Sequence, residues 1–298
     1  MGNNQSTDSN LIDNTLRNND NILEFTINQI SDFKQTLKLI NDIDHSVYDI
    51  NNKSINKFFR FEFYGQTDSD NSEEFKDGMR ILQMNPKRPA IIKLDIDADN
   101  FNYFKCNKPK IYIELILSKL ITHLDFIGDE NPVTFYIQKD KDNILFVKKK
   151  IDDNTEIITN MTITNSKVNI SNNINLSVES YNPKLIVNSS IFQKLKNYFS
   201  NTLDPINIKI SSGLSISLNT QGIINVELVI NLTNDKTDTY HWYYSEDNYN
   251  YSTLNAFNRC DKLCESVEIY CKENLPLMIV VPVINLGNLH VLLKHDNK

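Results

Sequence analysis

The chain has 298 residues, of which 40% are hydrophobic and 23% charged, and its formal net charge is −7. This composition supports a buried core and excludes a disordered chain, and the length suits one large domain or two ordinary ones. Four cysteines are too few for a disulfide framework. The sequence contains no apolar run of about 18 residues that would indicate a transmembrane helix, and its polar N-terminus lacks the apolar core of a secretory signal.

The N-terminal half is predicted to contain a strand, a helix, several strands, a second helix and further strands. Residues 1–21 are polar and Asn-rich, which predicts a disordered extension. Phe33, Leu37 and Ile40 follow helical spacing after a Ser31-Asp32 cap. The expected second helix covers 114–126, the expected strands are 23–27, 58–64, 79–84, 90–96, 103–106, 133–138, 143–147 and 156–163, and loops are expected at 44–56 and 65–77.

The same order of elements is predicted to begin again after a polar segment. Residues 165–184 are rich in Asn and Ser and are predicted to form a connector. The second half is expected to have helices at 191–199 and 252–263 and strands at 184–187, 206–210, 214–218, 224–232, 267–271, 277–283 and 290–293. The predicted class is therefore α+β, with two similar halves, mostly antiparallel strands and two helices in each half.

A search for catalytic and metal-binding motifs gives no specific match. The phosphate-binding glycine loops and the zinc-protease helix are missing, and Ser211–Ser215 lacks the flanking glycines of a nucleophile elbow. Cys260, Cys264 and the nearby Cys271 lack the fourth ligand that a zinc site needs. Cys260 and Cys264 are expected to be small buried residues. The sequence therefore predicts no enzyme, no metal and no cofactor.

Each of the four predicted helices has a polar stripe that is neutral or basic, whereas acidic residues concentrate in loops such as 68–77 and 140–153. One such stripe is an ordinary solvated helix face, but four together favour a positively charged surface on an acidic protein. The stripes consist of Lys34, Lys38 and Asn41; Ser118, Lys119 and Thr122; Gln193, Lys194, Asn197 and Asn201; and Asn255, Asn258, Arg259 and Lys262.

Several short segments, in order, resemble the eukaryotic-type sliding clamp PCNA. The resemblance spans about residues 22 to 293 and implies an N-terminal clamp domain at 22–164, a connector at 165–184 and a C-terminal clamp domain at 185–298. Sheets would lie outside and two helices per domain inside. The segments are Gly78–Met84, Phe101–Cys106, Ser118–Leu120, Ser190–Phe192, Leu254–Phe257, Pro276–Val281 and Gly287–Leu293.

The resemblance implies a DNA sliding clamp, a polymerase processivity factor that encircles double-stranded DNA as a homotrimer. The helices would line the hole, where their side chains would contact phosphates without reading bases. The implied DNA-facing residues are Lys34, Lys38, Asn41, Lys119, Lys194, Asn197, Asn255, Arg259 and Lys262. In a homotrimer, strands near 156–163 and 214–219 are expected to pair between subunits.

The resemblance also implies a pocket beneath the connector for the clamp-binding motifs of DNA polymerases and other partners. The matching positions are Met84, Ile91, Leu176, Val178, Pro276 and Leu292. Ile91 and Pro276 are equally well explained as core residues. The family's aromatic residue is replaced by Leu292 and the proline after it is missing, which suggests a different motif preference.

The resemblance further implies loading by an ATP-driven clamp loader and action in the nucleus or in a cytoplasmic viral replication factory. Abundant Asn and Ile indicate an AT-rich genome, which favours a large DNA virus or a protist. Two alternatives stay open: a monomeric or heterotrimeric clamp subunit, and a clamp-fold scaffold that no longer encircles DNA. Neither a membrane nor a cofactor is expected.

Overall fold

The computed structural model describes residues 20–28, 30–46, 58–65, 77–84, 90–129, 132–165, 181, 184–199, 206–210, 216–220, 245–249, 251–272 and 275–294. Residues 1–19 of the predicted extension, most of the connector, most of both predicted loops and the predicted strand at 224–232 lie outside the described residues, whereas Asn21, predicted to be disordered, begins the first strand. Every strand pair among the described residues is antiparallel. Among the described residues, no helix is long and apolar enough to cross a membrane.

The order of elements repeats in the two halves of the chain. The strands of the first half are β1 (Asn21–Ile27), β2 (Phe58–Tyr64), β3 (Gly78–Met84), β4 (Ala90–Asp97), β5 (Tyr103–Cys106), β6 (Lys110–Ile116), β7 (Val133–Gln138), β8 (Ile144–Lys150) and β9 (Glu156–Thr162). Those of the second half are β10 (Lys184–Asn188), β11 (Ile206–Ile210), β12 (Ile216–Thr220), β13 (Ser245–Tyr249), β14 (Ser266–Tyr270), β15 (Leu277–Val283) and β16 (Gly287–Leu293). The helices are α1 (Ile30–Ser46), α2 (Leu117–Ile127), α3 (Ile191–Phe199) and α4 (Tyr251–Ala256), with 3-10 turns at Ala98–Asn100 and Phe257–Lys262.

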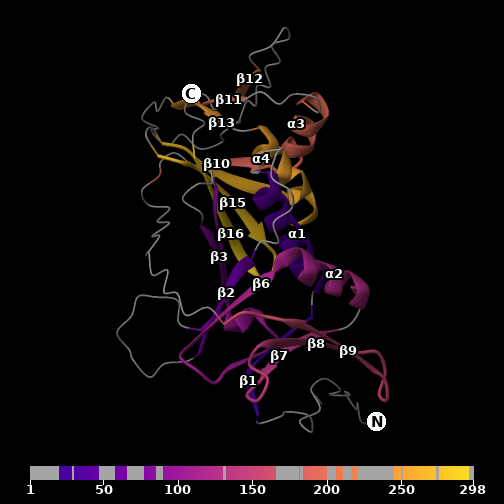
Figure 1. Cartoon of the computed structure of the whole chain (residues 1–298). Coiled ribbons are helices and arrows are strands. Elements are labelled where there is room, and N and C mark those ends of the chain that lie inside the picture. The colour runs from indigo at the N-terminus through magenta and orange to yellow at the C-terminus, as the bar shows by residue number, and fades with distance from the viewer. Residues whose placement is uncertain are drawn as a thin grey trace, which may run out of the picture.

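The strands form three sheets. A five-stranded sheet has the order β5-β1-β7-β8-β9, an eight-stranded sheet has the order β10-β14-β15-β16-β4-β3-β2-β6, and a three-stranded sheet has the order β12-β11-β13. The eight-stranded sheet joins the two halves of the chain through the β4–β16 pair, in which Leu94 lies opposite Leu289. Figure 1 shows the three-stranded and five-stranded sheets at opposite ends of the molecule, with the eight-stranded sheet between them.

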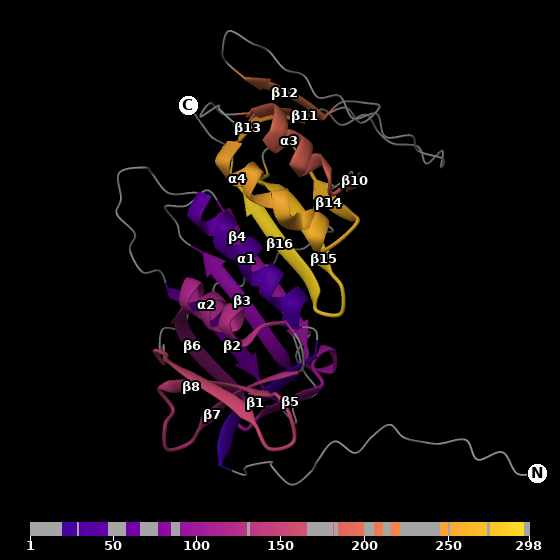
Figure 2. The same cartoon turned by 90° about the vertical axis from the view of Figure 1, so that its right-hand side faces the viewer.

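The four helices lie on one side of the eight-stranded sheet (Figures 1 and 2). The helix α1 packs there because Phe33, Leu37 and Ile40 follow one face and are fully buried, as the spacing predicts. Burying such a side chain contributes about 1.5–3 kcal/mol. The ring of Phe33 meets the ring of Phe135 on β7 edge-on, with their centroids 6.1 Å apart, which ties the five-stranded sheet into the same core.

Two helix boundaries differ from the sequence prediction. Residues 114–116 were expected to begin a helix but end strand β6, because the backbone of Glu114 exchanges two hydrogen bonds of 2.8 and 2.9 Å with Thr164. The helix α2 therefore begins at Leu117. The helix expected at 252–263 is α4 followed by the 3-10 turn Phe257–Lys262. The helix α1 begins at Ile30, so Ser31 and Asp32 lie in its first turn instead of capping it.

The helix α2 ends where its last carbonyl groups find partners. Gly128 has φ of +81°, a backbone conformation that glycine adopts without strain, and its amide donates to the carbonyl of Leu124 at 3.1 Å. The buried Lys149 donates from Nζ to the carbonyl oxygen of Ile127 at 2.7 Å. A cation at this position also complements the negative end of the helix dipole.

Candidate nucleic-acid interface and partner surface

The helices form one continuous layer across both halves of the chain (Figure 2). The helix α2 contacts α1, α1 contacts α4 and the following 3-10 turn, and both of these contact α3. The side of this layer away from the sheets is therefore a single surface to which every helix contributes. We call it the helix surface.

Lys34 does not lie on the helix surface as the sequence predicts. It is only 5% exposed, and its ammonium group points between α1 and α2, where it pairs with Asp129 and lies 3.4 Å from Oδ1 of Asp125. A buried ammonium group needs such partners, because removing it from water without them is costly. Lys34 thus ties two helices together, and its assignment as a DNA-facing residue is wrong.

Lys38 and Asn41 lie on the solvent side of α1 and are half-buried. Nζ of Lys38 donates to Oδ1 of Asp125 at 2.9 Å. The hydrogen bond from Lys38 is the main cause that lowers the pKa of Asp125, and the nearby Lys34 adds to it. Both Lys38 and Asp125 keep part of their side chains in water, at 25% and 47% exposure.

A second ion pair crosses from one half of the chain to the other. Nε of Arg259, in the 3-10 turn after α4, donates to Oδ2 of Asp42 on α1. Both side chains are about one-third exposed, so solvent and ions still reach them. Asn255 is half-buried in the neighbouring turn, where its carbonyl accepts a hydrogen bond of 2.6 Å from the side chain of Asn258.

The other predicted DNA-facing residues are exposed. Lys119 on α2, Lys194 and Asn197 on α3, and Lys262 at the end of the 3-10 turn all reach water. Lys196 on α3 is also exposed and was missed by the sequence prediction, because it lies beside the stripe that helical spacing selects. Asn201 lies outside the described residues.

Acidic side chains lie beside the predicted polar stripes. Asp42, Asp125 and the exposed Asp261 lie on the same elements as the lysines. The stripes were chosen by spacing along each helix, and this spacing does not show which acids of a neighbouring helix lie opposite. The helix surface therefore has exposed amino groups beside ion pairs, and its charge is less positive than predicted.

On the opposite side of the eight-stranded sheet, a small group of apolar side chains lies apart from the main core. Ile91 on β4 is the Cα partner of Leu292 on β16, and Leu292 is the partner of Met278 on β15. The group consists of Tyr270, Met278, Val280 and Leu292, with Ile91 and Tyr181 packed against it. We call it the outer apolar cluster.

Tyr181 connects this cluster to Pro276. Its hydroxyl donates to the Pro276 carbonyl at 3.0 Å, and its ring meets the ring of Tyr270 edge-on at 6.4 Å. Three of the predicted pocket residues, Ile91, Pro276 and Leu292, are therefore brought together.

Leu176 and Val178 lie outside the described residues, and only the backbone of Met84 is described, opposite Ile91.

The sequence prediction missed Tyr181, Tyr270, Met278 and Val280. A signal for two of them is present in β15, whose residues are apolar at successive positions instead of alternating. Such a strand is covered on both faces, so its outward residues belong to a second apolar group. Tyr181 has no comparable signal, because it is a single aromatic residue in a polar segment.

His290 lies next to this cluster and is half-buried. Burial is the main cause that lowers its pKa, and the Lys93 cation adds to the effect, while Asp95 and Glu268 oppose it. Within the described residues, Nδ1 of His290 is buried and has no hydrogen-bond partner. The side chain is therefore held mainly in its neutral form.

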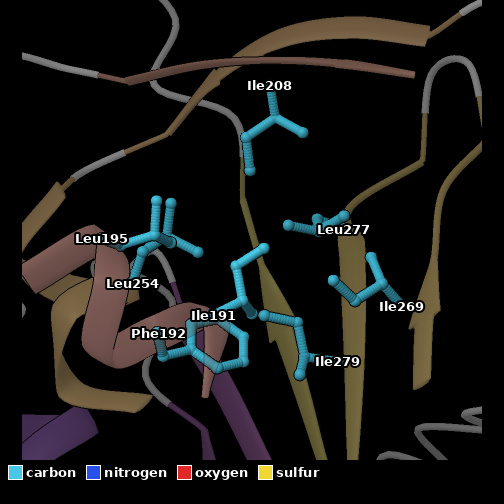
Figure 3. A pocket seen from close by; sticks show the side chains of 8 residues that line it. All are labelled: Ile191, Phe192, Leu195, Ile208, Leu254, Ile269, Leu277 and Ile279. Carbon is cyan, nitrogen blue, oxygen red and sulfur yellow. The ribbon is translucent and has the colours of Figure 1, made fainter. Parts of the chain in front are cut away.

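A small cavity lies in the C-terminal half between α3, α4 and the strands (Figure 3). Its lining is entirely apolar and consists of Ile191, Phe192, Leu195, Ile208, Leu254, Ile269, Leu277 and Ile279. Ligand sites usually add a few polar groups to an apolar lining, and this cavity has none. Among the described residues, no three His, Cys, Asp or Glu side chains are placed to hold a metal ion.

Comparison with known proteins connects this arrangement to clamps. No family model matches the chain. The chain is 24% identical, over 296 residues, to a protein named probable DNA polymerase sliding clamp from Acanthamoeba polyphaga mimivirus. This match covers 94% of the chain but only 63% of the relative. Two uncharacterized proteins of the same virus are 28% identical over 199 residues and 23% identical over 283 residues, covering 65% and 91% of the chain and 68% and 77% of those proteins.

The structural match covers nearly the whole of the matched chain. A crystal structure of the PCNA2–PCNA3 complex from Sulfolobus tokodaii aligns with 92% of the chain and 99% of the matched chain, with a TM-score of 0.67 and 14% identity. The fold is that of the DNA clamps, with antiparallel sheets and a layer of four helices. More particularly, it is the PCNA-type clamp fold, which confirms the predicted α+β class and the resemblance found in the sequence.

Proposed function

We propose that the chain is a DNA sliding clamp, a non-enzymatic processivity factor that encircles duplex DNA and tethers replication enzymes to it. The observation that carries the proposal is the helix surface: in a chain of net charge −7, it presents exposed amino groups from α2, α3 and the 3-10 turn on one continuous layer. Such groups bind phosphates without reading sequence, and weak contacts of this kind let a protein slide. The name of the mimivirus relative supports the same function.

The ring would form by head-to-tail pairing of sheet edges, and two of the described edges suit this pairing. The strand β9 is at the edge of the five-stranded sheet, and β12 is at the edge of the three-stranded sheet among the described residues. These sheets lie at opposite ends of the molecule (Figure 1), as a closed head-to-tail ring requires. Ile158 on β9 and Phe126 on α2 are 47% and 72% exposed, and α2 contacts β9.

These features support a homotrimer in which a neighbouring subunit covers the β9 edge. An open strand edge with apolar side chains is a liability in a monomer, because it invites pairing with other chains. We further propose that segment 156–163 of one subunit pairs with segment 214–219 of the next. The two clamp domains would end and begin at the connector, at 164–165 and 184–185.

The outer apolar cluster would bind partner proteins. Apolar and aromatic anchor side chains of a short partner motif would pack at Ile91 and Leu292 of this cluster and near Pro276, which Tyr181 links to it. We assign this surface to DNA polymerases and other proteins with clamp-binding motifs. Opening of the ring would require a clamp loader, and the protein would act where viral DNA is replicated, in the nucleus or in a cytoplasmic factory.

The test is salt-dependent binding to duplex DNA. Replacing four exposed lysines of the helix surface, Lys119, Lys194, Lys196 and Lys262, with alanine should weaken binding and lower the slope of log K against log salt by about 1 for each lysine that contacts a phosphate. The matched control replaces four exposed lysines that lie off the helices, Lys108, Lys139, Lys141 and Lys294. Equal losses in the two variants would contradict the proposed DNA face.

A second candidate function is a subunit of a mixed clamp. Three mimivirus proteins are similar to the chain, and the matched crystal structure contains two different clamp proteins. A mixed ring would use the same helix surface but would pair β9 with a different chain. Co-expression of the chain with each of the three similar mimivirus proteins, followed by measurement of the subunit ratio, distinguishes the two assemblies.

A further inference from the structure

The helix surface has carboxylates beside two of the cations that the proposed clamp would offer to DNA. Asp125 lies 2.9 Å from Nζ of Lys38, and Asp42 receives the hydrogen bond from Nε of Arg259. Each pair joins two different elements, α1 with α2 and α1 with the 3-10 turn. Each cation therefore already has an anionic partner in the free protein.

These pairs differ from the one that holds Lys34. The Lys34 ammonium is buried, so its pairing with Asp129 serves packing. Lys38 and Arg259 keep 25% and 36% of their side chains in water, and their carboxylates are similarly exposed. Ion pairs this exposed contribute only about 0–1 kcal/mol to stability, so a phosphate group can replace the carboxylate at little cost to the fold.

We propose that Asp42 and Asp125 compete with DNA phosphates for Arg259 and Lys38 and so limit the affinity of the helix surface for DNA. This inference rests on the proposed clamp function. Each carboxylate acts twice, because it occupies a cation and also repels an approaching phosphate. The low pKa of Asp125 keeps that carboxylate charged at neutral pH. A ring that is retained by its topology benefits from a weak grip, because weak phosphate contacts allow sliding.

The test replaces each carboxylate by its neutral amide. Asp125→Asn and Asp42→Asn should each bind a linear duplex more tightly than the wild-type chain. For each freed cation that meets a phosphate, the slope of log K against log salt should steepen by about 0.9, which corresponds to a gain of up to about eightfold at about 0.1 M salt. Fluorescence anisotropy of a labelled duplex over a salt series measures both quantities.

The matched control is Asp95→Asn. Asp95 forms the same kind of pair, with Nε of Arg80 at 2.6 Å, but on the face of the eight-stranded sheet that is opposite the helices. The Asp95→Asn substitution removes the same charge from the chain and should leave the affinity for DNA near the wild-type value. The double variant Asp125→Asn/Lys38→Gln should lose the gain of Asp125→Asn, because the freed cation is missing. Thermal melting of each variant checks that the fold is retained.

The outcomes separate this inference from the proposed function. Wild-type binding with no gain in Asp42→Asn and Asp125→Asn, or an equal gain in Asp95→Asn, overturns the inference and leaves the clamp function intact. Binding by the variants alone supports strong competition. If neither the wild-type chain nor any variant binds duplex DNA, both the inference and the proposed DNA face are wrong.

Discussion

Ile91 and Leu292 are direct Cα partners across the strand pair that joins the two halves of the chain. Both point to the outer apolar cluster, on the side of the sheet away from the helices. This strand pair therefore lies between the helix surface, which we propose for DNA, and the outer apolar cluster, which we propose for partner proteins.

Replacing Ile91 with glutamine should weaken binding of a peptide with apolar and aromatic anchors by at least about tenfold, a typical loss for a central interface residue. Ile91 is only partly buried, so the fold should be retained. Isothermal titration calorimetry with such a peptide measures the effect. Ile151→Gln is the matched control, since Ile151 is 48% exposed and follows β8, in the other sheet. Unchanged peptide binding in Ile91→Gln would place the partner site elsewhere.

Replacing Ile158 on β9 with lysine should reduce assembly, because a charge at a paired strand edge must be buried or repelled. The chain should then elute at a lower mass than the wild type at equal concentration. Ile284→Lys should not have this effect, since Ile284 is 63% exposed but lies in the turn between β15 and β16. Full assembly of Ile158→Lys would show that the β9 edge is not the subunit contact.

The Lys34 pair should respond asymmetrically to substitution. Asp129→Asn leaves the buried Lys34 ammonium group with only the carboxylate of Asp125, at 3.4 Å, so it should lower the free energy of unfolding by about 1–2 kcal/mol. This loss is smaller than the usual cost of breaking a buried pair because Asp129 is half exposed. Lys34→Met keeps the packing and should change the free energy of unfolding by less than about 1 kcal/mol. Urea unfolding measures both. A larger loss for Lys34→Met than for Asp129→Asn would contradict this explanation.

His290 should make the folded state sensitive to mild acid. Its pKa in the folded state is lowered by burial and by Lys93, against the opposing charges of Asp95 and Glu268. The unfolded chain therefore binds the proton more readily than the folded chain. The stabilisation of the folded state by neutral His290 is fully present above the ordinary His pKa of about 6.5, and it is lost as the pH falls toward the lower pKa of the folded state. Wild-type protein should therefore lose more stability than His290→Gln between about pH 7.5 and about pH 5.5. Equal losses in the two proteins would contradict the lowered pKa.

Much of the fold could be predicted from the sequence. A run of aromatic residues gives β2, and helical spacing gives α3, with the bounds that the structure has. The strand β6 was missed because Lys110–Ile116 runs directly into α2 and its last residues fit both periodicities. The strand β13 was missed because its sequence, Ser245–Tyr249, is mostly polar.

The site was harder to predict because its chemistry depends on pairs from different elements. Exposure of Lys119 follows from its own helix, whereas burial of Lys34 depends on Asp125 of the next helix and on Asp129, just after that helix ends. Spacing along one helix gives the face that a residue occupies but not which side chains lie across from it. The outer apolar cluster is similar, because the pairing of Ile91 with Leu292 joins distant parts of the chain.

The native mass in solution at about 100 mM salt, a low enough concentration to preserve ionic contacts, tests the ring most directly. Each chain has a mass of 34.6 kDa. Light scattering coupled to size-exclusion chromatography should give about three times this mass, at micromolar concentration, for the chain expressed alone. A mass of one chain across this range would contradict a stable homotrimeric ring.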